Sequence, residues 1–162
     1  MSERTAAVVV AVDGPSGSGK SSVCRAVAER FGYAHLDTGA MYRAVRWWCD
    51  HARIDVRDTD AVRGALSGLQ LVLCTEPSDP GIAVRVGERA VDVTDAIRDP
   101  HISATVSEVA TNLDVRADLV ERQQAIIRHT VEGGRGIVVE GRDITTVVAP
   151  DAQVRVLLTA SQ

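Results

Sequence analysis

The chain has 162 residues, a formal net charge of −4 at pH 7 and 45% hydrophobic residues, as is usual for a soluble globular domain. This length can bury a sound core without disulfides or metals, and the charge excludes a global basic field that would attract nucleic acid. No apolar run is long enough to span a membrane, no signal peptide is recognisable, and the three cysteines form no C-x-x-C pair. We expect a cytoplasmic protein with reduced thiols that binds neither nucleic acid nor a membrane, and we expect a monomer.

A glycine-rich loop follows the first expected strand, residues 8–13, and precedes an expected helix. The loop fits the pattern G-x-x-x-x-G-K-[ST]. In such a loop the backbone N–H groups turn toward phosphate oxygens, and the helix start adds its positive dipole end. Lys20, the only lysine of the chain, would reach the β- and γ-phosphates, and the Ser21 hydroxyl would complete the shell of a Mg²⁺ ion. We assign nucleoside triphosphate binding to the loop and the residues next to it: Gly14, Pro15, Ser16, Gly17, Ser18, Gly19, Lys20, Ser21 and Ser22.

The helix after the loop is expected at residues 23–31. Val23, Val27 and Phe31 fall on one stripe, as in an amphipathic helix. Gly32 is expected to end the helix because glycine readily adopts the left-handed conformation found there.

A second strand is expected at residues 33–37. It carries Asp37 at its carboxyl end, the edge at which ligands of open α/β sheets bind. Thr38 is predicted to cap the next helix, which continues through Trp48. We interpret His35 as a neutral, half-buried side chain without a chemical role.

Residues 67–99 show a different pattern. Residues 69–73 and 82–86 alternate between apolar and polar side chains, and residues 90–93 follow a tight turn. Segments of period two joined by turns that contain Pro and Gly predict antiparallel hairpins. We interpret residues 67–99 as a small β insertion.

Helices are expected at residues 100–110 and 113–131, and two further parallel strands at residues 136–140 and 154–158. These elements alternate in the way that is typical of an α/β fold. We predict a P-loop NTPase-type three-layer α/β/α fold with a parallel central sheet.

The domain prediction follows from this alternation. The core that carries the glycine-rich loop is assigned to residues 1–66 and 100–162, and the β insertion to residues 67–99. A strand that ends near Gln162 would normally lead into a further helix and strand. We therefore expect the sequence to be incomplete at its C-terminus.

Other groups suited to a phosphorylated ligand are expected at the carboxyl edge of the same sheet. Arginine makes forked contacts with phosphate, and a carboxylate can accept a hydrogen bond from the amino group of a base. The N-K-x-D motif of GTPases is absent, and so are a catalytic triad and a His/Cys cluster with metal-ligand spacing. The candidate residues are Tyr42, Arg43, Ser107, Arg116, Arg142 and Asp143.

Several motifs together resemble those of bacterial cytidylate (CMP) kinases, which belong to the nucleoside monophosphate kinase group of P-loop kinases. The resemblance extends along essentially the whole chain, and the enlarged β insertion is also a feature of that family. The motifs are Val12 to Ser21, Leu36-Asp37-Thr38-Gly39-Ala40-Met41-Tyr42-Arg43, Glu140-Gly141-Arg142-Asp143, and Thr146-Val147-Val148 with Pro150-Asp151-Ala152.

The resemblance implies transfer of the γ-phosphoryl group of ATP to CMP or dCMP with Mg²⁺, by in-line displacement. Lys20 and Arg142 would be catalytic. Arg142 would hold the CMP phosphate together with Arg43, in a pocket lined by Thr38 and Tyr42. The residues implied to face the cytosine edge are Ser107, Arg116 and Asp143.

Two departures from the family pattern are visible. Thr145 stands where glycine is expected, which could stiffen or reshape the turn. The lid that carries arginines, together with the last strand and helices, is absent after Gln162, and a chain that ends there is expected to have very weak kinase activity. The alternatives are a small-metabolite kinase of the shikimate or gluconate type and a nucleotide-binding module without turnover.

Overall fold

The computed structural model describes residues 6–160. Residues 1–5 and 161–162, which bear on the predictions about a signal peptide and about the chain end, lie outside the described residues. The described chain divides into two compact units, and each is considered by itself. The first unit comprises residues 6–38, 75–79 and 122–160, and the second comprises residues 39–74 and 80–121.

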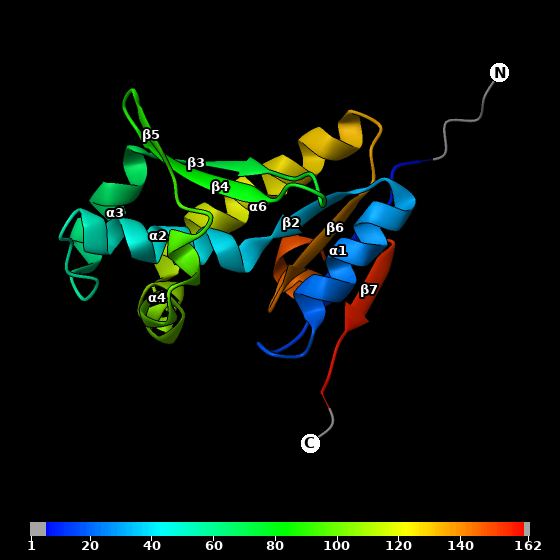
Figure 1. The fold of residues 1–162 in the computed structure, drawn as a ribbon, viewed down its shortest axis with the longest axis horizontal. Helices are drawn as coiled ribbons and strands as arrows, with labels where there is room; N and C mark the ends of the chain where they lie inside the picture. The colour runs from blue at the N-terminus through cyan, green and yellow to red at the C-terminus, as the bar shows by residue number, and fades with distance from the viewer. Residues whose placement is uncertain (1–5, 161–162) are drawn as a thin grey trace. The chain divides into compact units, whose positions relative to one another are not determined.

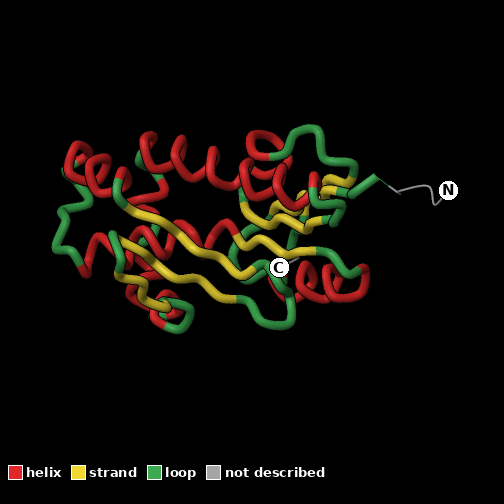
Figure 2. Tube along the Cα trace, turned by 90° about the horizontal axis from the view of Figure 1, so that it is seen from above, coloured by secondary structure: helices red, strands yellow, loops and turns green. Residues whose placement is uncertain are grey.

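The first unit contains a four-stranded parallel sheet (Figures 1 and 2). Its strand order is β2-β6-β1-β7, formed by β2 (Ala34–Asp37), β6 (Ile137–Gly141), β1 (Val9–Asp13) and β7 (Val154–Leu157). All three strand pairs are parallel, as predicted. Strand β6 pairs on both edges and is buried at every residue, which explains the apolar run at residues 137–139.

Helix α1 (Lys20–Phe31) packs against β2 and β6, and it starts three residues before the predicted position. It ends at Gly32, whose φ of 69° confirms the predicted glycine C-cap. Only the middle of the apolar stripe packs against the core, through the half-buried Val27, because Val23 is 50% and Phe31 is 60% exposed. The buried face consists of the small residues Cys24 and Ala28, which allow the helix to approach the sheet closely.

An apolar groove of about 350 Å³ runs along this exposed stripe. It lies between α1 and the adjoining sheet residues. Its lining combines Val8, Val10, Val12, Val23, Cys24, Val27, Phe31, Tyr33, Val138, Val154, Val156 and Leu158.

Helix α2 (Thr38–His51) begins at Thr38, so the prediction that this residue caps the helix from outside is wrong. Its hydroxyl instead donates a hydrogen bond to the backbone oxygen of Glu140 at 2.8 Å. Helix α3 (Thr59–Ser67) was not predicted, since it buries only Val62 and Leu66. Its start nevertheless has a signal in the sequence, because the Asp58 carboxylate caps it by accepting from the Ala61 N–H at 3.0 Å.

The second unit contains the antiparallel sheet predicted for the insertion. Strand β4 (Gly81–Val86) pairs on one side with β3 (Leu69–Cys74) and on the other with β5 (Arg89–Asp92). The alternation in β3 and β4 places Leu69, Ile82 and Val84 in the core, whereas every residue of β5 is exposed.

The remaining elements are helical. The short helix η1 (Ala96–Arg98) leads into α4 (Pro100–Thr105) and α5 (Ser107–Ala110), so the single helix predicted at residues 100–110 is two helices separated at Val106. Helix α6 (Leu113–Glu132) follows, and a π-helical turn, η2 (Ile144–Val148), begins after Arg142 and Asp143, the two residues that follow β6. Within residues 6–160, none of these helices has the length and apolar character required to traverse a bilayer.

Candidate active site

The glycine-rich loop leaves the carboxyl end of β1 and enters α1. Gly17 and Gly19 have φ angles of 79° and 78°, a region that other residues seldom adopt. The Val23 N–H donates to the Gly19 oxygen, which closes the first turn of α1. The sequence therefore folds here as predicted, into a strand, a tight loop and a helix start.

The ammonium group of Lys20 folds back over the loop. Its Nζ donates to the Gly14 oxygen at 2.8 Å. The hydroxyl and the backbone N–H of Ser18 both donate to the Pro15 oxygen, at 2.8 and 3.4 Å. These contacts order the loop from within and place the positive charge of the only lysine beside it.

Glu140 connects three elements around the start of α1. Its side chain is almost fully buried, since the residue is 1% exposed. The Ser21 hydroxyl donates to Oε1 at 2.5 Å, and Nε2 of His35 lies 2.7 Å from Oε2. With the bond from Thr38 to its backbone oxygen, Glu140 joins the loop helix to both ends of the β2–α2 connection.

These contacts govern how Glu140 ionises. Burial raises the pKa of Glu140, but the hydrogen bonds from His35 and Ser21, together with the charges of His35 and Lys20, outweigh it. The net result is a pKa below the ordinary value of 4.5. The Glu140 side chain is therefore a carboxylate at neutral pH, and it accepts the hydrogen bond from the Ser21 hydroxyl.

The described cysteines are all free thiols, as predicted. Burial raises the pKa of Cys24 to about 12, and the nearby Glu140 charge adds to the effect. Burial likewise raises the pKa of Cys49 to about 11, although the Arg46 charge opposes it. Cys74 is exposed.

Sequence reasoning did not assign a role to Glu140 or to its contact with His35. His35 is 7% exposed, so the prediction of a half-buried side chain is wrong. The available signal was an acid at the end of a buried strand, next to a histidine on a second strand. What could not be read from the sequence is that β2 and β6 are neighbours, which brings two residues 105 positions apart into contact.

Arg142 and Asp143 follow β6 at the same edge of the sheet. Arg142 is exposed, and its Nη2 donates to the Ser16 hydroxyl of the loop at 2.8 Å. The backbone is joined as well, because the Gly14 N–H donates to the Gly141 oxygen at 3.2 Å. The predicted residues of the loop, Thr38, Arg142 and Asp143 therefore all belong to the first unit.

The other four predicted residues belong to the second unit. Tyr42 and Arg43 lie on α2 and are half-buried. Ser107 is the exposed first residue of α5. Arg116, on α6, is half-buried, and its Nη1 lies 3.5 Å from the Ala110 oxygen.

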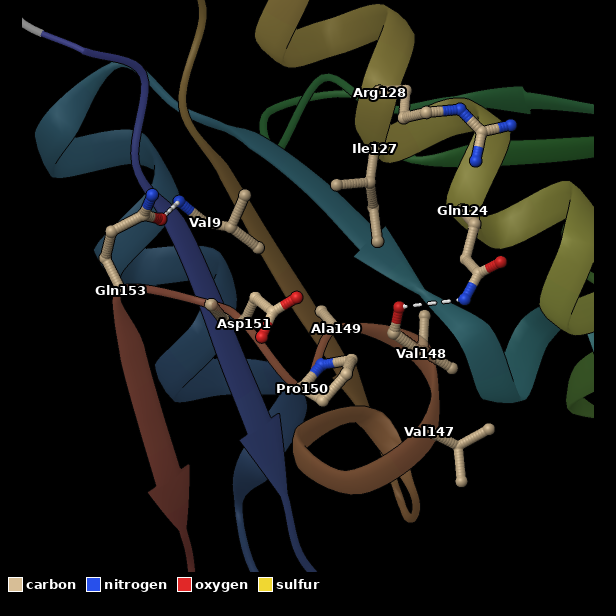
Figure 3. A pocket seen from close by; sticks show the side chains of 11 residues that line it. Val9, Gln124, Ile127, Arg128, Val147, Val148, Ala149, Pro150, Asp151 and Gln153 are labelled. Carbon is tan, nitrogen blue, oxygen red and sulfur yellow. Dashed lines mark hydrogen bonds between the residues drawn. The ribbon is translucent and has the colours of Figure 1, made fainter.

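A cavity of about 430 Å³ lies elsewhere in the first unit (Figure 3). None of the predicted site residues contributes to it. Its walls are formed by Val9, Gln124, Ile127, Arg128 and the segment 147–153. Figure 3 shows Gln124 reaching from α6 to the end of the π-helical turn, where its Nε2 donates to the Val148 oxygen at 3.3 Å.

The strand, glycine loop and helix on a parallel sheet, with a lysine over the loop and a hydroxyl in the first turn of the helix, define a P-loop nucleotide-binding protein. The chain belongs to the cytidylate kinase family, whose model matches residues 10–162.

Curated relatives agree with this membership. A cytidylate kinase of Cutibacterium acnes is 51% identical over 158 residues, which are 96% of this chain and 67% of that protein. A cytidylate kinase of Streptomyces avermitilis is 43% identical over 155 residues, 64% of its length. A bifunctional pantoate ligase/cytidylate kinase of Synechococcus is 50% identical over 159 residues, 97% of this chain, and the chain spans 30% of its length.

Proposed function

We propose that the protein transfers the γ-phosphoryl group of ATP to CMP or dCMP, giving ADP and CDP or dCDP. The observation that carries this proposal is the Lys20-bearing loop at the carboxyl end of β1, with Arg142 hydrogen-bonded to Ser16 of that loop. Membership of the cytidylate kinase family supports CMP as the acceptor.

The loop forms the donor half of the proposed site. Its backbone N–H groups and the start of α1 attract the ATP phosphates, and Lys20 exchanges its contact with Gly14 for the β- and γ-oxygens. Binding of this kind holds the γ-phosphoryl group in line with the acceptor and neutralises the charge that develops on transfer.

The residues around Ser21 fit a hard divalent cation such as Mg²⁺, which prefers oxygen ligands. The Ser21 hydroxyl donates a hydrogen bond to Glu140, so the lone pairs of the Ser21 oxygen remain available to a metal ion. Bound Mg²⁺, held through the Ser21 hydroxyl, would neutralise part of the phosphate charge. Glu140, held by His35 on its other oxygen, keeps the hydroxyl in this orientation.

The acceptor half follows from the arginines. We assign Arg142 and Arg43 to the CMP phosphate, because a guanidinium matches two phosphate oxygens at once. A phosphate acceptor is already an anionic nucleophile at neutral pH, so a general base is unnecessary. We assign Thr38 and Tyr42 to the wall of this pocket. The residues assigned to the cytosine edge are Ser107, Arg116 and Asp143, and residues 67–99 are assigned to the part of the protein that binds the monophosphate.

A coupled assay of ADP release tests the proposal with CMP, dCMP, UMP, AMP and shikimate as acceptors. We expect CMP or dCMP to be preferred by kcat/KM at least about tenfold over the other acceptors, the range that a few site-specific hydrogen bonds provide. A preference for shikimate would favour a small-metabolite kinase. ATP binding without turnover on any acceptor would favour a nucleotide-binding module.

The variant Lys20→Ala tests whether Lys20 is needed for phosphoryl transfer and not for folding. We expect a loss of turnover of at least about 1,000-fold, since the only ammonium at the phosphates is removed. Unfolding by heat should occur within a few degrees of the wild type because Lys20 contacts a single backbone oxygen. Full activity of this variant would rule out the loop as the donor site.

A further inference from the structure

The carboxylate of Asp13 ends β1 immediately before the glycine-rich loop. It is buried, with the residue 5% exposed, and a buried carboxylate needs hydrogen-bond donors to offset its lost hydration. Three donors meet it, and all come from the turn after β6. The Ile144 N–H donates to Oδ1 at 2.8 Å, while the N–H and the hydroxyl of Thr145 donate to Oδ2 at 3.0 and 2.5 Å.

The turn that makes these contacts is fixed at both ends. Asp13 holds its first two residues, and Gln124 holds the backbone oxygen of Val148 at its far end (Figure 3). Inside the turn, the N–H groups of Val147 and Ala149 donate to the oxygens of Asp143 and Ile144. The turn is therefore a rigid attachment for the residues just before it.

Those residues are Arg142 and Asp143. On their N-terminal side, Gly141 is held against the loop by the bond from the Gly14 N–H to its oxygen. A Cβ on Gly141 would meet the Thr38 hydroxyl and the Ile144 side chain, so these groups would have to shift. The backbone of Arg142 and Asp143 is thus held between Gly141 on one side and the contacts of Asp13 on the other.

We infer that Asp13 and Thr145 are positioning residues that hold Arg142 and Asp143 beside the phosphate loop. The inference rests on the proposed function, in which these two residues bind the acceptor. The Thr145 hydroxyl offers the most direct test. Of the three donors to Asp13 it alone belongs to a side chain, so a substitution can remove it. A fixed backbone lowers the entropy that a long, exposed arginine side chain loses when it binds a phosphate.

The test compares Thr145→Val, which removes the hydroxyl at nearly constant shape, with Thr145→Ser, which keeps it. Thr146→Val is the matched control, because Thr146 is exposed, lies in the same turn and makes only a 3.5 Å contact with the Asp143 oxygen. We expect Thr145→Val to raise KM for CMP about 5- to 30-fold and to change KM for ATP by less than about twofold. Thr145→Ser and Thr146→Val should remain close to the wild type.

Two further measurements make the result decisive. Asp13→Asn should act in the same direction as Thr145→Val and more strongly, since its amide N–H₂ opposes a donor; if this variant does not fold, the Thr145 pair decides alone. Amide hydrogen exchange at residues 141–146 should be faster in Thr145→Val than in Thr146→Val. Equal changes in both KM values, or equal exchange in the two valine variants, would overturn the inference. If wild-type protein does not use CMP, the proposed function is lost, and the exchange measurement still decides the positioning role.

Discussion

The two sheets of this protein differ in where their polar groups lie. In the parallel sheet, charged side chains are buried at the strand ends: Asp13 on β1 and Glu140 on β6 are 5% and 1% exposed. In the antiparallel sheet, the corresponding acid is Asp92 at the end of β5, which is exposed and whose carboxylate accepts a hydrogen bond from the N–H of Thr94, two residues away. Buried carboxylates require partners from distant segments, whereas an exposed one is satisfied by water and its neighbours.

The difference follows from how the strands of each sheet are connected. A parallel sheet collects the ends of its strands at one edge, so residues far apart in sequence share hydrogen bonds there. The antiparallel sheet is built from neighbouring hairpins, and its alternating pattern serves packing on one face. Changes at the buried acids of the first sheet should therefore affect stability through contacts between distant segments, and changes in the second sheet should affect it through packing on one face.

The largest expected effect comes from truncating the buried carboxylate. Glu140→Ala leaves His35 and Ser21 without their shared partner, and we expect a loss of about 3–5 kcal/mol in the free energy of unfolding. Urea unfolding followed by circular dichroism measures this loss. Asp92→Ala is the control in the other sheet and should leave the urea midpoint close to that of the wild type. Equal midpoints for both variants would contradict the contrast between the sheets.

The next effect concerns packing in the antiparallel sheet. Ile82→Ala removes a side chain that is 4% exposed, and we expect a loss of about 2–4 kcal/mol. Val91→Ala on β5, where the side chain is 45% exposed, should cost less than about 0.5 kcal/mol. The melting temperatures of the two variants measure this difference. A larger loss for Val91→Ala would mean that β5 is covered in solution.

The pH dependence of stability sharpens the same contrast. Because the pKa of folded Glu140 lies below its ordinary value of 4.5, ionisation stabilises the fold above that pH, and the stabilisation is lost as the pH falls through the folded-state pKa. Glu140→Gln cannot titrate, so we expect its melting temperature to fall less than that of the wild type as the pH is lowered from neutrality to below 4.5. Parallel curves for the two proteins would show that Glu140 does not contribute to acid sensitivity.

Much of the fold could be predicted because the signals are local. The loop pattern, the glycine after α1 and the period of two in β3 and β4 each depend on residues close together in sequence. The exposure of Val23 and Phe31 on α1 could not be predicted, since the small buried residues Cys24 and Ala28 carry no strong amphipathic signal. Helix α3 was missed for a similar reason, because two buried residues do not establish a helical period.

The contacts around the candidate site could be predicted only in part. Arg142 was expected near the loop because both follow strand ends, and its contact with Ser16 is found. The roles of His35 and Asp13 depend on which strands are adjacent and on how the turn after β6 is wound. Thr145 was expected only to stiffen or reshape the turn in place of a glycine, yet its hydroxyl reaches a carboxylate 132 positions away.

The environments of the three thiols have a practical consequence. A thiol with a pKa of about 11 or 12 is almost entirely protonated at about pH 8, and protonated thiols react poorly with maleimides and iodoacetamide. Cys24 and Cys49 are also buried, whereas Cys74 is exposed at the end of β3. Mass spectrometry after brief alkylation should find the label on Cys74, and early label on Cys24 would contradict the buried environment. The wild-type protein thus offers a natural attachment point for a fluorophore on the antiparallel sheet, without any engineered cysteine.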